Sequence, residues 1–297
     1  MSRRQALIAL NLALLTTVPA LAAQPPTPPA GWTDGYVIAN GIRIHYWRTG
    51  GNKLPLILAH GSSDDGLCWT NLAIELVADF DVIMPDARGH GLSDPPSAGE
   101  PADAQVDDLA GIINELHLTK PIVMGHSMGA SAAAWFGAKY PGVARAVVLE
   151  DPGLLPRGDG GGGNSDPEAR RRQTLERNNR GYDEMVAQCV KNSPAWGLDE
   201  CRIWAPSKLR HHPNTAYRRL GDRPAMSDLF AKITVPTLII KADAPPDVRR
   251  QNEEVAAKLA HGKIVHIDGA GHNVRREQKQ LLLDALKPFL AKFKSRT

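Results

Sequence analysis

Short apolar runs alternate with segments of helical length along most of this chain, and this alternation restricts the fold more than any other feature. A continuous apolar run at 54–59 indicates a strand buried on both faces, and mostly apolar runs indicate further strands at 81–84, 121–124, 144–149 and 236–240. Amphipathic or apolar stretches long enough for helices separate most of them. Strands joined through helices predict an α/β protein with a mostly parallel, doubly wound sheet.

Two departures from the alternation refine the domain organisation. Two short strand-like segments flank the turn dipeptide Asn40-Gly41, which predicts a β-hairpin ahead of the parallel strands. Residues 153–233 interrupt the alternation for roughly eighty residues, which is too long for a loop. We therefore expect a core formed by 35–152 and 234–297, with a helical cap inserted after the sixth strand. The cap begins with a glycine-rich loop at 158–164.

A serine lies where a buried strand meets a helix. The run 121–124 leads into a five-residue motif and then into the helical segment 130–140; the motif is Gly125-His126-Ser127-Met128-Gly129. A sharp turn between strand and helix exposes a serine hydroxyl and places it beside backbone N–H groups. Glycines permit such a turn, because a side chain would collide there. Ser127 is therefore the predicted nucleophile.

Four motifs in a fixed order make residues 36–293 resemble the α/β-hydrolase fold superfamily. They are His60-Gly61, the stretch Asp86-Ala87-Arg88-Gly89-His90-Gly91-Leu92-Ser93, the elbow at Ser127, and Gly269-Ala270-Gly271-His272. The chain is most similar to the branch of lidded serine esterases, lactonases and carbon–carbon hydrolases. The resemblance implies an eight-stranded sheet, and it implies that Arg88 and His90 tie their own loop together rather than react.

The resemblance also implies a base and an acid for Ser127. His272 would take the serine proton, since a histidine pKa lies near working pH. The acid usually follows the strand 236–240, where Asp243 is the first carboxylate, and Asp243 is expected to orient His272.

The spacing around Asp243 departs from the family pattern, so other acids stay open. Asp247 is one alternative. The carboxylates that follow the sixth strand are another, Glu150 and Asp151.

Two backbone N–H groups would stabilise a negatively charged oxygen during the reaction. The resemblance places one on Met128, at the start of the helix, and the other on Ser62, after His60-Gly61. Asp64, Asp65 and Trp69 follow closely and are candidate pocket residues, although Trp69 in this position more often packs in the core.

The first 23 residues have the composition of a cleavable secretory signal. Arg3 and Arg4 precede an apolar segment, and small residues then indicate cleavage near Ala22 or Ala23. The apolar segment is too short for a membrane span, so no stable membrane insertion is expected after cleavage. A proline-rich stretch follows at 24–34. The sequence thus predicts export to the periplasm or the medium.

Charge and cysteine content limit the partners. The formal net charge is +3, and loss of the signal would leave +1, because it contains two arginines and no acidic residue. This near-neutral balance indicates no nucleic-acid partner. Cys189 and Cys201 could form a disulfide in an oxidising compartment, with two free thiols as the alternative and Cys68 left buried. No cysteine–histidine spacing indicates a metal site, and no cofactor is expected.

The resemblance and the motifs together predict a secreted serine hydrolase that cleaves a small ester or lactone through an acyl-enzyme. Alternatives on the same fold are a carbon–carbon bond hydrolase, a cofactor-free perhydrolase or haloperoxidase, and an aminopeptidase for N-terminal proline. A non-catalytic binding protein is the remaining alternative. The basic and histidine clusters of the cap are expected to form a solvated helix face, with an anion site as the alternative; they are Arg170–Arg172 and His211-His212.

Overall fold

A computed structural model of the chain describes residues 24–155, 166–218 and 222–294. The expected signal segment and the expected glycine-rich loop of the cap lie outside the described residues.

The core is a sheet with the strand order β1-β2-β4-β3-β5-β6-β7-β8. The pairs β1–β2 and β2–β4 are antiparallel and the remaining pairs are parallel, which confirms the predicted eight-stranded, mostly parallel sheet. The predicted hairpin is present, with Asn40 and Gly41 both at positive φ. The strands are β1 Thr33–Ala39, β2 Ile42–Arg48, β3 Leu54–Ala59, β4 Phe80–Pro85, β5 Ile122–His126, β6 Ala146–Glu150, β7 Thr237–Lys241 and β8 Gly262–His266.

Helices cover both faces of the sheet. The α-helices are α1 Thr70–Ala73, α2 Ala104–Glu115, α3 Met128–Lys139, α4 Pro167–Asn178, α5 Tyr182–Asn192, α6 Gly197–Leu209, α7 Met226–Phe230, α8 Pro246–Ala256, α9 Val274–Glu277 and α10 Lys279–Ala291. The 3-10 helices whose full extent is described are η1 Gly66–Trp69, η2 Pro194–Trp196 and η3 Pro213–Tyr217.

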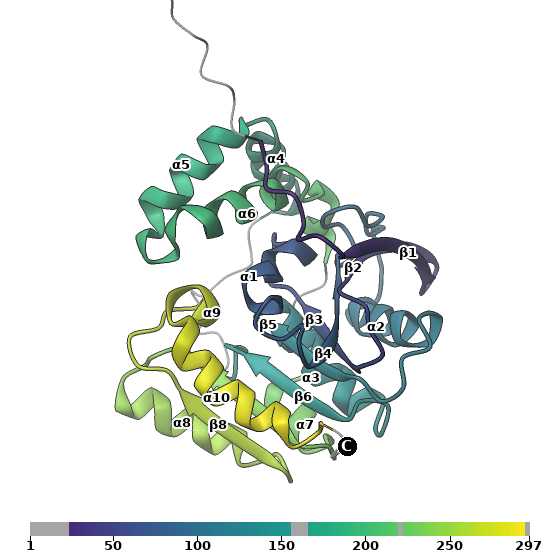
Figure 1. Cartoon of the computed structure of the whole chain (residues 1–297), viewed down its shortest axis with the longest axis vertical. Helices are drawn as coiled ribbons and strands as arrows, with labels where there is room; N and C mark the ends of the chain where they lie inside the picture. The colour runs from purple at the N-terminus through teal and green to yellow at the C-terminus, as the bar shows by residue number, and fades with distance from the viewer. Residues whose placement is uncertain (1–23, 156–165, 219–221, 295–297) are drawn as a thin grey trace, which may run out of the picture.

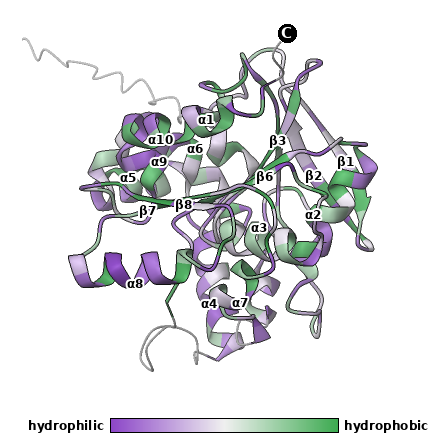
Figure 2. Cartoon of the chain, turned by 90° about the horizontal axis from the view of Figure 1, so that it is seen from below, coloured by the Kyte–Doolittle hydropathy of each residue, from purple (hydrophilic) through white to green (hydrophobic). Residues whose placement is uncertain are grey.

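Side chains alternate between the two faces along each central strand. In β3, Ile57 packs into the cluster beneath α2, α3, α7 and α8, whereas Leu56 and Leu58 pack into the cluster beneath α1 and α10. Burial on both faces explains why these strands are continuously apolar in sequence. Figure 2 shows the hydrophobic strands β3 and β6 inside a periphery where α4 and α8 are largely hydrophilic.

The chain between β6 and β7 forms a group of helices beside the sheet. Figure 1 shows α4, α5 and α6 clustered apart from the helices that flank the strands. The predicted disulfide is present, and Cys189–Cys201 joins α5 to α6. Later in the same stretch, α7 returns to the core cluster against α3. Within the described residues, no helix has the length and apolar character needed to cross a membrane.

Close backbone contacts at the start of α3 require glycine. A Cβ atom added to Gly129 would lie 2.1 Å from the carbonyl oxygen of Ala59, and one added to Gly125 would lie 2.2 Å from the carbonyl oxygen of Gly129. These neighbours are backbone atoms that cannot rotate away. The motif therefore brings the end of β3 against α3, as its two glycines predict.

We expect Gly129→Ala to lower the free energy of unfolding by about 2 kcal/mol or more, because the added carbon overpacks a rigid backbone contact. Gly137→Ala is the matched control on the same helix, where the nearest atom would be a Val147 methyl at 3.3 Å. Alanine also favours a helix interior, so this variant should stay within about 1 kcal/mol of wild type. Urea unfolding followed by tryptophan fluorescence measures both, and equal effects would contradict the steric account.

Candidate active site

Ser127 occupies a strained turn between β5 and α3. Its φ of 51° is in the left-handed region, which a residue with a side chain rarely adopts. Two backbone hydrogen bonds hold it there: Ser127 N–H donates to the carbonyl of Glu150 at 3.0 Å, and Ser131 N–H donates to the carbonyl of Ser127 at 3.0 Å. The turn directs the hydroxyl of Ser127 toward the loop that follows β8.

His272 on that loop is the hydrogen-bond partner of the Ser127 hydroxyl. Ser127 Oγ lies 2.9 Å from His272 Nε2, so the serine O–H can donate to the ring. The loop is held from two sides, because the carbonyl of His272 accepts from His126 Nε2 at 2.9 Å and the Glu277 carboxylate accepts from the N–H groups of Gly271 and Asn273. The ring of His272 is fixed by neighbours while its side chain remains 55% exposed.

Asp151, the residue directly after β6, completes the arrangement. Its Oδ2 lies 2.5 Å from His272 Nδ1. Its Oδ1 lies 2.5 Å from Lys241 Nζ and accepts from the N–H of Ala242 at 3.1 Å. Burial alone would raise the pKa of Asp151, but the hydrogen bond from His272 and the Lys241 ammonium outweigh it and lower that pKa to about 2. The carboxylate is therefore ionised when it accepts from the histidine.

The expectation that Asp243 orients His272 is wrong. Asp243 is exposed, and its carboxylate binds the Arg249 guanidinium and the N–H of Gly269 at 2.8 Å instead. Its backbone N–H is tied to the carbonyl of Ala270, which holds it beside the base loop without reaching the ring.

The other two alternative acids do not contact His272 either. Glu150 is fully buried and accepts from the backbone and side chain of Arg275, at 2.8 and 3.2 Å. Asp247 lies exposed in the first turn of α8. Of the three alternative acids, only Asp151 contacts the His272 ring.

The local sequence contained a signal for this arrangement. β6 lies between β5 and β7 in the sheet, so the residue after β6 is closer to the nucleophile strand than any residue after β7. The end of β7 carries Lys241, whose charge pairs with Asp151. Lys241, the last residue of β7, therefore supplies a cation to the acid on the neighbouring strand, whereas the expected acid Asp243 lies two residues further along.

The loop after β3 packs tightly on the serine turn. A Cβ atom added to Gly61 would lie 2.5 Å from His126 Nδ1, so this glycine allows the loop to approach. Met128 is the first residue of α3, where N–H groups have no acceptor within the helix. These contacts place Ser62 and Met128 on the two segments that meet at the serine, as an oxyanion site requires, and their role stays a prediction.

Asp64 anchors that loop through a buried charge cluster, which we define as Asp64, Lys208, Arg275 and Arg276. Lys208 Nζ of α6 lies 2.6 Å from Asp64 Oδ1, and the two arginines of α9 approach Asp64 Oδ2 at 3.1 and 3.0 Å. Burial would raise the pKa of Asp64, but the three cations hold it well below its usual range. Lys208 also donates to the carbonyl of Ser63 at 2.8 Å.

The three candidate pocket residues are therefore interior ones. Asp64 is enclosed by its three cations, and Trp69 is fully buried with the Arg275 guanidinium over its ring. Asp65 is buried and caps η1 by accepting from the N–H of Cys68. Their contacts are structural, and Cys68 is buried as expected.

Arg88 and His90 have structural contacts, as expected, whereas His211 differs from its expectation. Arg88 pairs with Asp108 and Glu100, and His90 is buried with Nδ1 2.9 Å from the carbonyl of Arg88. His211 was expected on a solvated face, but it is buried and stacks on His90 with a centroid distance of 4.6 Å.

The arrangement can activate a hydroxyl. A serine O–H that donates to a histidine, whose other nitrogen donates to a carboxylate, can transfer its proton as the oxygen attacks an electrophilic carbon. In the described parts of the chain, no group of three histidine, cysteine or carboxylate side chains could hold a metal ion.

Comparison with known proteins adds independent findings. A sequence model of the alpha/beta hydrolase family matches residues 56–285. The 2-(acetamidomethylene)succinate hydrolase of Mesorhizobium japonicum is 29% identical, over 80% of this chain and 88% of that protein.

Solved structures agree with the sequence comparison. A crystal structure of E-2-(acetamidomethylene)succinate hydrolase matches with a TM-score of 0.72 and 25% identity, covering 88% of this chain and 99% of the other. A thermophilic esterase from Thermogutta terrifontis with bound malate matches with a TM-score of 0.67 and 26% identity, covering 89% and 100%.

The lowered pKa of Asp151 predicts a pH-dependent contribution to stability. The folded pKa of about 2 lies below the unfolded value. The contribution is therefore present above the unfolded pKa and is lost as pH falls toward 2. Between pH 6 and pH 3, the free energy of unfolding of wild type should fall by about 1 kcal/mol more than that of Asp151→Asn. Urea unfolding at each pH measures this, and parallel declines would contradict the ionised pair.

Proposed function

This chain belongs to the α/β-hydrolase family, and we propose that it is a serine hydrolase that cleaves small esters or lactones through an acyl-enzyme. The observation that carries the proposal is the continuous contact from Ser127 Oγ to His272 Nε2 and from His272 Nδ1 to Asp151. A fold alone hosts many activities, whereas this contact has a defined chemical use.

The proposed reaction has two halves, and in each half His272 first accepts a proton and then donates it. His272 Nε2 takes the proton of Ser127 as Oγ bonds to the substrate carbonyl carbon, and the carbonyl oxygen becomes negative. The N–H groups of Ser62 and Met128 would stabilise that oxygen. His272 then gives the proton to the leaving oxygen, which departs as an alcohol. Water attacks the acyl group by the same route and releases the acid.

Asp151 has a positioning role in this scheme. Its ionised carboxylate accepts from Nδ1–H, which leaves Nε2 free to accept the serine proton. The same negative charge stabilises the imidazolium that forms during attack. Lys241 keeps the carboxylate charged and fixes its other oxygen at 2.5 Å.

Helices α4–α6 would act as a cap that encloses a small substrate. The Asp64 cluster supports this proposal, because Lys208 ties α6 to the loop that carries Ser62. A cap held at this point favours an enclosed substrate over an extended polymer.

We further propose that the protein works outside the cytoplasm. The signal-like N-terminal sequence supports export. The disulfide between Cys189 and Cys201 also supports it, because such bonds persist in oxidising compartments.

Reaction with a fluorophosphonate probe tests the proposal, read by intact mass. Wild type should gain one adduct, and Ser127→Ala should gain none. Asp151→Asn should react about 1,000-fold more slowly or worse, because the histidine loses its orienting anion. Asp243→Asn is the matched control and should react within about twofold of wild type, since its ion pair is exposed.

Short p-nitrophenyl esters, lactones and N-acyl compounds then define the bond that is cleaved. Amides are included because the relative from Mesorhizobium japonicum is named for a substrate with an acetamido group. An unlabelled wild type, or equal losses in Asp151→Asn and Asp243→Asn with circular dichroism unchanged, would contradict the proposed roles.

A further inference from the structure

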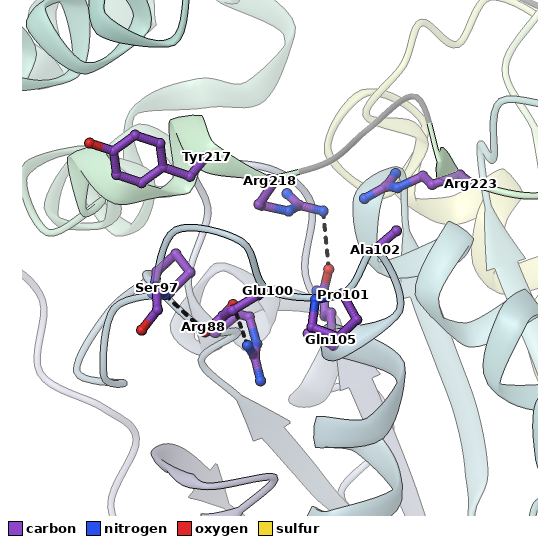
Figure 3. A pocket seen from close by; sticks show the side chains of 11 residues that line it. Arg88, Ser97, Glu100, Pro101, Ala102, Gln105, Tyr217, Arg218 and Arg223 are labelled. Carbon is purple, nitrogen blue, oxygen red and sulfur yellow. Dashed lines mark hydrogen bonds and ion pairs between the residues drawn. The ribbon is translucent and has the colours of Figure 1, made fainter.

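A small, partly open pocket lies between α2, the loop after β4 and the segment that follows η3. Its described lining includes three arginines and a single carboxylate (Figure 3). The arginines are Arg88, Arg218 and Arg223, and the carboxylate is Glu100. The net charge that these four side chains present to the pocket depends on the partners of each one.

Arg88 and Glu100 neutralise each other within the loop. Arg88 donates to Asp108 at 2.6 and 2.5 Å and also pairs with Glu100. The other oxygen of Glu100 accepts from the N–H of Ser97 at 2.9 Å. Both oxygens of the only carboxylate in the described lining are therefore engaged, and Glu100 is not directed to Arg218.

Arg218 makes its side-chain contacts with neutral partners. Nη1 lies 2.6 Å from the sulfur of Met128, and Nη2 donates to the side-chain oxygen of Gln105 at 3.2 Å. Among the residues that the structure describes, no carboxylate pairs with this guanidinium. Figure 3 shows Arg223 extending toward it from the opposite side, so the facing charge is of the same sign.

Arg218 is a poorly solvated cation. Burial and the charges of Arg223 and Arg88 lower the pKa of Arg218 to about 9, so the group stays protonated at neutral pH. A partly buried cation without an anion is costly, and an arriving anion would relieve that cost. The planar guanidinium matches the two oxygens of a carboxylate.

Arg218 contacts the residue that follows Ser127. Met128, whose sulfur Arg218 contacts, directly follows Ser127 and carries one of the expected oxyanion N–H groups. One methionine side chain thus separates the guanidinium from the segment that would bind the reacting carbonyl.

We propose that Arg218 binds a carboxylate of the substrate, so that the preferred substrates are small acyl compounds carrying a second, free carboxylate. This inference rests on the proposed serine hydrolase function and adds the class of substrate to it. A half-ester of a short dicarboxylic acid has the required chemistry: its ester carbonyl would lie at Ser127 and its free carboxylate at Arg218.

A matched pair of substrates isolates the charge. Monomethyl glutarate carries a carboxylate, and methyl 5-amino-5-oxopentanoate has the same length with a neutral amide in its place. Wild type should show a kcat/KM for the half-ester that is about 10- to 100-fold higher, as expected for charge-assisted hydrogen bonds. The half-esters of succinate and adipate locate the best distance between the two groups.

Variants assign the preference to the residue. Arg218→Gln should bring the ratio of the two kcat/KM values close to 1, with most of the change in KM, and Arg218→Lys should restore part of it. Arg202→Gln is the control, because this arginine on α6 pairs with Asp199 and lies outside the pocket lining; its ratio should equal that of wild type.

The outcomes separate the two proposals. If wild type does not react with the fluorophosphonate probe, the serine hydrolase function fails and the substrate class fails with it. If wild type reacts with the probe but shows a ratio below about 2, or cleaves none of the half-esters, only the carboxylate inference is overturned. The wild-type ratio decides the matter even if an Arg218 variant does not fold.

Discussion

A single buried carboxylate holds together the parts of the molecule that meet at the reaction site. Asp64 follows the loop that carries Ser62, and it pairs with Lys208 of α6 and with Arg275 and Arg276 of α9. One anion therefore joins the loop after β3, the helix after His272 and the helices inserted after β6. Removing one member of such a group leaves a buried charge unbalanced, at a cost of about 3–5 kcal/mol. The relative placement of Ser127, His272 and α6 depends on this balance.

Three of the six non-glycine residues that have positive φ in the described structure lie at the same end of the sheet. Ser63, Ser127 and Asp151 all have positive φ, although none is glycine. They follow β3, β5 and β6, which are consecutive in the sheet. Each such conformation costs about 1–3 kcal/mol and persists only where the surroundings impose it. The core beneath, with its completely buried central strands, supplies that rigidity, so the reacting groups are placed before a substrate arrives.

The sequence predicted the sheet, the serine turn and the base, because each is encoded locally by apolar runs, by glycines and by a motif. The acid that contacts His272 could not be identified from local sequence in this way. Asp151 and Asp243 both follow strands, and only the sheet order and the charge of Lys241 distinguish them. Arg218 was missed for a related reason: its interest lies in having no carboxylate partner among the described residues, and the pairing of charges is a property of three-dimensional packing. His211 was misjudged because a polar residue among polar neighbours gives no local sign of burial.

The chain leaves the sheet for the inserted helices immediately after Asp151, at Pro152. The stem of the insertion and the residue that orients the base are therefore covalent neighbours. Insertions in this position can change in length and composition at their far helices, where few core contacts constrain them. Their first residues cannot drift in the same way, because any change of direction there rotates the carboxylate. Divergence of substrate range in such proteins is thus channelled toward the outer helices and away from the point of attachment.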